Sequence, residues 1–164
     1  MKPISRSKNL RLHWRANSGG SFKPDDDCDL YSSQDIDQHA MISLDIADVQ
    51  NVDELRFSMR LPDEKLRLIS ITLRSGKDFG HFFIKPANFA DGNVILHSYD
   101  VDKSSENFSF EKVESISIRL YPLARHTINN FCVNSLRFAS KLWVYKVRYV
   151  INLLIFITHF LLPA

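Results

Sequence analysis

The sequence has little of several residue types, and each shortage excludes a class of site. It contains only two cysteines, Cys28 and Cys132, without CxxC spacing, so it holds neither a disulfide framework nor a zinc site of cysteine ligands. One long-range bridge stays open, but two unpaired thiols are the favoured state. Its five glycines form no phosphate-binding loop, and no GxSxG nucleophile motif is present.

Histidine pairs and an apolar N-terminal stretch are also absent. The six histidines form no HxxxH or HExxH pair, so the sequence does not support a metal site, and we expect no cofactor. Residues 1–16 contain no apolar stretch, so we expect no cleavable secretory signal. The aspartates of residues 25–29 lack the spacing of a calcium loop and are expected to form a solvated turn.

Acidic residues are missing from both ends of the chain. Residues 1–24 and residues 115–164 each carry six lysines or arginines and no acid, although the formal net charge of the whole chain is only +2. Basic ends of this kind either contact an anionic surface or are dispersed cations in solvent, and both interpretations remain open.

The middle of the chain alternates apolar and polar side chains. Residues 55–61 do so first, and residues 66–74 follow after a turn at residues 62–65, which predicts two half-buried strands. Their apolar face needs a second sheet to cover it, so the sequence predicts an all-β sandwich in one domain. Further strands are expected at residues 10–14, 40–46, 79–85, 94–99, 108–120 and 130–138.

The chain divides into three predicted parts. Residues 1–38 form a basic and acidic segment that is partly irregular, and residues 39–139 form the sandwich. Residues 140–164 form a C-terminal hydrophobic helix, because residues 142–162 are apolar nearly all round. That run is long enough to span a bilayer if Lys146 and Arg148 reach the headgroups.

We therefore expect the tail to be a single-pass membrane anchor. The side chains expected to contact the membrane are Trp143, Tyr145, Lys146, Arg148, Tyr149, Leu153, Phe156 and Phe160. Arg137, Lys141, Lys146 and Arg148 lie on the N-terminal side of the tail and nothing charged follows, so the positive-inside rule predicts a cytoplasmic sandwich. A buried core helix, a helix lying in the interface and the first span of a longer membrane enzyme are the alternatives.

Five strand phrases between about residues 40 and 139 carry a family resemblance. They are Leu44–Ile46 (LDI), Val52–Phe57 (VDELRF), Ile71–Gly76 (ITLRSG), Val113–Leu120 (VESISIRL) and Val133–Phe138 (VNSLRF). In this order they resemble the galactose-binding-like jelly-roll domains, which include non-catalytic carbohydrate-binding modules and accessory domains of polysaccharide-processing enzymes. The resemblance implies a jelly-roll fold and a non-catalytic module that binds a glycan or a partner protein.

Sugar binding by a sandwich needs an aromatic platform and a few polar side chains. The candidates at polar-facing or loop positions are Trp14, Tyr31, Arg74, His97, Tyr99 and Tyr121, with ordinary packing as the competing interpretation of each. The phenylalanines expected in the core are Phe57, Phe82, Phe108, Phe131 and Phe138. We expect carbohydrate or a partner protein as ligand, and no nucleic acid.

Two other functions remain open. The first is that of an accessory domain of a membrane glycosyltransferase or polysaccharide-processing enzyme. The second is that of a structural protein-interaction domain. Asp45 with Asp48, or Asp53 with Glu54, would be the carboxylate pair for glycoside hydrolysis. Aspartate is common at such strand connections for reasons of turn geometry, so we expect no catalysis there.

Overall fold

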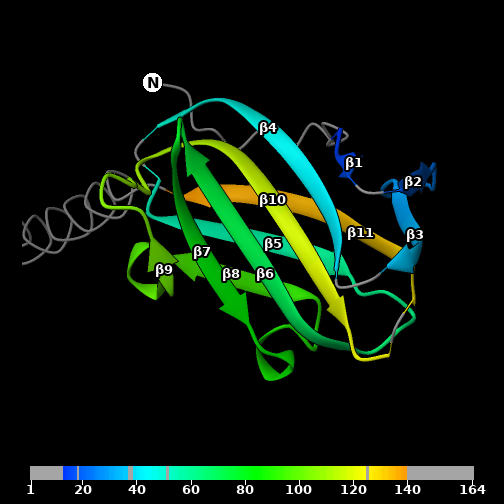
Figure 1. The fold of residues 1–164 in the computed structure, drawn as a ribbon. Helices are drawn as coiled ribbons and strands as arrows, with labels where there is room; N and C mark the ends of the chain where they lie inside the picture. The colour runs from blue at the N-terminus through cyan, green and yellow to red at the C-terminus, as the bar shows by residue number, and fades with distance from the viewer. Residues whose placement is uncertain (1–12, 18, 37–38, 51, 125, 140–164) are drawn as a thin grey trace, which may run out of the picture.

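Two antiparallel β-sheets packed face to face make up the fold (Figure 1). The structure is a computed structural model, and it describes residues 13–17, 19–36, 39–50, 52–124 and 126–139. Within these residues the predicted all-β sandwich is confirmed.

The strands divide into a six-stranded and a five-stranded sheet. The six-stranded sheet has the order β1 (Arg15–Asn17), β4 (Ala40–Gln50), β10 (Lys112–Pro122), β6 (Leu66–Ser75), β7 (Asp78–Ile84) and β9 (Lys103–Ser104). The five-stranded sheet has the order β2 (Gly20–Lys23), β3 (Leu30–Ile36), β11 (His126–Ala139), β5 (Glu54–Arg60) and β8 (Asn93–His97). Two short 3-10 helices, η1 (Pro86–Asn88) and η2 (Ser98–Asp100), follow β7 and β8.

The pairing of the strands is that of a jelly roll. β3 pairs with β11, β4 with β10, β5 with β8 and β6 with β7, so each pair is nested inside the previous one along the chain. Successive pairs alternate between the two sheets. A long hairpin that is rolled up gives this arrangement, which brings distant parts of the sequence side by side.

The apolar face of each sheet supplies the core. In β5 the inward side chains are Leu55, Phe57 and Met59, and in β6 they are Ile69, Ile71 and Leu73. Phe57, Phe82 and Phe131 are buried, and Phe108 and Phe138 pack against the core as partly buried rings. Three of the five phenylalanines expected in the core are therefore confirmed there, and the other two lie at its edge.

Several predicted boundaries differ from the observed ones. β4 continues to Gln50, four residues beyond the end of the strand expected at residues 40–46. Residues 108–111 form no strand, and β10 begins at Lys112. Three of the described strands precede residue 39: β2 and β3 belong to the five-stranded sheet, and β1 belongs to the six-stranded sheet.

Cys28 and Cys132 form a disulfide, and the preference for two unpaired thiols was wrong. The two residues are 104 positions apart, and their Cα atoms are 6.2 Å apart. The physical reason is the pairing of β3 with β11, because it brings the loop before β3 beside Cys132. Spacing along the chain says nothing about proximity in a fold with such long-range pairing.

The C-terminal prediction lies outside the described residues. Residues 140–164, with the eight expected membrane contacts, are not described, so the anchoring helix remains a prediction. Among the residues that the structure describes, no helix has the length and apolar character needed to span a membrane.

Candidate functional site

An exposed aromatic pair lies where β8 ends and η2 begins. The ring of Tyr99 in η2 is 79% exposed and stacks on the ring of His97, with centroids 4.8 Å apart and planes at 11°. The Asp100 carboxylate accepts a hydrogen bond of 3.1 Å from the His97 backbone N–H, which fixes the turn that carries Tyr99. The sequence prediction thus named both rings, and the structure brings them together.

The neighbouring strand holds the His97 ring from one side. His97 lies opposite Glu54 of β5 in the register of the two strands, and its Nδ1 is 3.6 Å from the Glu54 Oε2 atom. Arg56 donates a hydrogen bond to the other oxygen of the same carboxylate. The Glu54 carboxylate beside the His97 ring and the hydrogen bond from the His97 backbone to Asp100 position the platform before any ligand binds.

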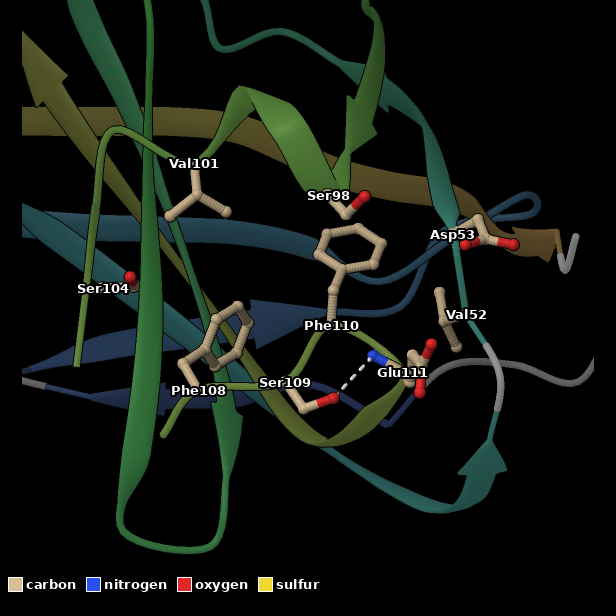
Figure 2. A pocket seen from close by; sticks show the side chains of 9 residues that line it. All are labelled: Val52, Asp53, Ser98, Val101, Ser104, Phe108, Ser109, Phe110 and Glu111. Atoms are coloured by element: carbon tan, nitrogen blue, oxygen red, sulfur yellow. Dashed lines mark hydrogen bonds between the residues drawn. The ribbon is translucent and has the colours of Figure 1, made fainter. Parts of the chain in front are cut away.

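A pocket of about 320 Å³ adjoins this platform and shares Ser98 with the same turn (Figure 2). Val52 and Phe110 are buried in its wall, and Ser98, Ser109 and Glu111 add polar groups. Its full lining consists of Val52, Asp53, Ser98, Val101, Ser104, Phe108, Ser109, Phe110 and Glu111. Four of these residues are apolar and five are polar or charged, so the pocket offers hydroxyl and carboxylate groups to a ligand.

The pocket wall depends on a glycine in β7. The Phe108 ring packs over Gly80, where a Cβ atom would lie 2.4 Å from the Phe108 ring. Ser109 Oγ accepts a hydrogen bond of 3.3 Å from the Glu111 backbone N–H, shown as the dashed line in Figure 2. The segment that replaces the expected strand at residues 108–111 is thus a packed turn that lines the pocket.

The other four predicted site residues lie elsewhere. Trp14 and Tyr31 are buried in the core, so their rings offer no face to a ligand. Arg74 and Tyr121 lie on the outer face of the six-stranded sheet, away from the pair at η2. There Tyr121 packs between the His39 ring, at 5.4 Å, and the Arg67 guanidinium, at 5.6 Å.

Sequence reasoning missed an aromatic row on that same outer face. Phe79, His81 and Phe83 alternate along β7 and point away from the core, with successive ring centroids 4.6 and 6.2 Å apart. The period-2 spacing of three rings was the signal that could have found them. Within the described part of the chain, no three His, Cys, Asp or Glu side chains are grouped to hold a metal ion.

The chain is similar to solved structures, but it matches no sequence family. No family model matches the chain, and no curated protein matches it. The chain is similar to the crystal structure of a carbohydrate-binding module specific for non-crystalline cellulose (CBM28), with 12% identity, a TM-score of 0.49 and coverage of 77% of this chain and 88% of that one. It is also similar to the agarase AgWH50C, with 12% identity, a TM-score of 0.48 and coverage of 82% of this chain but only 24% of the agarase.

Proposed function

We propose that this sandwich is a non-catalytic module that binds carbohydrate at the Tyr99–His97 platform. The observation that carries the proposal is the Tyr99 ring, which is largely exposed, stacked on His97 and set beside a pocket with polar groups. An exposed aromatic ring costs hydrophobic free energy unless a ligand covers it. The C–H face of a sugar ring packs on such a surface, while Ser98 and Glu111 offer partners to its hydroxyl groups.

The support beneath the platform favours binding of a rigid ring. Tyr99 has few side-chain rotamers, and its ring already stacks on the His97 ring, so little conformational entropy is lost when a sugar stacks on the pair. Such preorganised aromatic contacts give affinity without any reacting group. The module therefore needs no catalytic residue to act as proposed.

Tyr99→Ala is expected to weaken carbohydrate binding by about tenfold, because the loss of one stacked ring costs about 1.4 kcal/mol. Tyr99→Phe keeps the ring and should stay within about threefold of the unchanged protein. Calorimetric titration of the full-length chain with hydroxyethyl cellulose, xylan and soluble galactan would measure these affinities.

Leu123→Ala is the matched control. Leu123 is 68% exposed but lies just beyond the far end of β10, so its loss should change affinity by less than about twofold. Unchanged affinity of Tyr99→Ala for a polysaccharide that the protein binds would refute the platform. Absence of binding to all three polymers would refute the proposed carbohydrate function.

We also propose that the sandwich resides in an oxidising compartment. The Cys28–Cys132 disulfide supports this placement, because such bonds persist in extracellular or periplasmic surroundings and are rare in the cytosol. It is the reverse of the cytoplasmic placement that the positions of the cations predicted. If the sandwich is in an oxidising compartment, alkylation in intact cells should leave both cysteines unmodified. If it is cytoplasmic, both thiols should react.

A further inference from the structure

The outer face of the six-stranded sheet combines an aromatic row with hydroxyl groups. Phe83 is 44% exposed at one end of the row, and Phe79 and His81 are half-buried beside it. On β6, Ser70 lies opposite Phe83 and Thr72 lies opposite His81. On β10, Ser117 continues the row of Thr72, so the floor next to the rings is made of hydroxyl-bearing side chains.

Two of these hydroxyl groups are almost fully buried although they face outward. Ser70 and Thr72 are each 1% exposed. Thr72 Oγ1 has a partner in His81 Nδ1, at 2.8 Å. Ser70 Oγ has no hydrogen-bond partner among the described residues, and an unsatisfied buried hydroxyl is costly unless something else pairs with it.

Three cations surround this row. Arg119 of β10 lies opposite Ser70, Arg74 of β6 lies opposite Phe79, and Lys103 of β9 lies opposite His81. Arg119 Nε contacts the Met41 sulfur at 3.3 Å, which holds the side chain over the sheet. Within the described part of the chain, none of these three cations forms an ion pair with a carboxylate.

The carboxylates near the same face already have partners. Asp102 accepts a hydrogen bond of 2.7 Å from the Phe83 backbone N–H, and Asp78 accepts one of 2.9 Å from Ser105. Glu114 pairs with Lys112 at 3.1 Å and accepts the Gly76 N–H at 2.9 Å. Asp45 pairs with Arg15 at the far edge, at 2.6 Å. None of these four carboxylates pairs with Arg74, Arg119 or Lys103, so the three cations can still pair directly with anionic groups of a ligand.

The same three cations affect the pKa of His81. Burial lowers the pKa of His81 most, and the nearby Arg119, Arg74 and Lys103 lower it further. Its other neighbours are Thr72 and the rings of Phe79 and Phe83. A cationic imidazole is disfavoured there because like charges already face it from β6, β9 and β10.

We infer that this face is a second binding site, for an anionic polysaccharide whose carboxylate or sulfate groups pair with Arg74, Arg119 and Lys103 while its sugar rings stack on Phe83 and Phe79. Charge complementarity selects the anion, and the aromatic row selects a ligand with ring faces. The site does not depend on Tyr99, so it goes beyond the proposed function.

The test compares the full-length chain with a charge variant and a matched control. The double variant Arg74→Gln/Arg119→Gln should lose about tenfold or more in affinity for polygalacturonate. Hydrogen bonds between charged groups contribute more to binding than hydrogen bonds between neutral groups. Arg137→Gln removes one positive charge from an exposed position on β11 in the other sheet and should change affinity by less than about twofold. Affinity of the unchanged protein should fall with added salt.

Three further arms identify the ligand. Dextran sulfate in place of polygalacturonate separates sulfate from carboxylate recognition, and binding of either polymer supports the site. Phe83→Ala should lower affinity about fivefold through loss of ring contact. With dextran sulfate, which stays ionised, affinity should rise as the pH falls from 7 to 5, because a bound anion raises the pKa of His81 and linkage is reciprocal. His81→Gln should abolish that rise.

Several results would overturn the inference. The first is that neither polyanion binds. The second is that the double arginine variant binds as tightly as the unchanged protein. The third is that Phe83→Ala does so, which would leave charge alone as the cause of binding. Equal competition by a DNA oligonucleotide of the same charge would identify a general polyanion surface and refute a glycan site. Tyr99→Ala should leave polyanion affinity unchanged, so failure of the Tyr99 platform and failure of this site are distinguishable.

Discussion

Cys132→Ser is expected to lower the free energy of unfolding by about 3–5 kcal/mol. The disulfide closes a loop of 104 residues, and in the chain-entropy account a loop of this length removes about 4.7 kcal/mol of entropy from the unfolded state. Cys28 and Cys132 are both buried, so the variant also leaves polar groups in the interior without gain. Urea unfolding followed by tryptophan fluorescence would measure the loss.

The control separates the bond from the side chains. Cys28→Ser/Cys132→Ser should match the single variant within about 1 kcal/mol, because the bond is already lost in either one. Reduction of the unchanged protein should give a similar loss, which disappears on reoxidation. Equal stability of the reduced and oxidised proteins would contradict the bond as a source of stability.

The disulfide joins the loop before β3 to β11, which was predicted as a strand at residues 130–138. The loop that contains Cys28 precedes β3, and Arg60 of β5 pairs with Asp25 of the same loop at 2.7 Å. The Asn134 side-chain oxygen lies 2.9 Å from the Cys132 sulfur and 3.3 Å from the Cys28 sulfur. Loss of the bond should therefore loosen the β3 end of the five-stranded sheet first.

The predictability of each strand depended on its pattern of side chains. β5 and β6 were predictable because their inward positions are all large and apolar. β3 was not recognised because its buried positions are Tyr31 and Ser33, whose polarity hides the alternation. The strand expected up to residue 99 ends earlier, at His97, because Asp100 turns the chain into η2.

The candidate sites show the same dependence on context. Tyr99 was predictable as a ring at the polar end of the strand expected at residues 94–99, and it is exposed. Trp14 could not be assigned, because a ring next to polar residues can point either way and here it enters the core. Phe79 and Phe83 were overlooked because Phe82 and Ile84 make the opposite face of β7 apolar too, which hides which face is outward.

Gly92→Ala is expected to cost about 2–5 kcal/mol, from a backbone penalty of about 1–2 kcal/mol and an overpacking penalty of about 1–3 kcal/mol. Gly92 has φ +77°, and a Cβ atom there would lie 2.2 Å from the Met59 backbone oxygen. Its own carbonyl accepts a 2.7 Å hydrogen bond from the Met59 N–H, so the turn cannot move away without losing that bond. Urea unfolding would measure the cost.

Gly76 is the matched control, since it has φ +61° but a Cβ atom added there would meet no other atom within 4 Å. Gly76→Ala should therefore cost only the backbone penalty, about 1–2 kcal/mol. Asparagine tolerates positive φ, so Gly76→Asn should recover most of that loss, whereas Gly92→Asn should not, because its Cβ still meets the Met59 oxygen. Recovery at both positions would show that conformation alone matters at Gly92.

Because Gly92 immediately precedes β8, which leads to His97 and Tyr99, Gly92→Ala should also weaken carbohydrate binding at the platform, whereas Gly76→Ala should not.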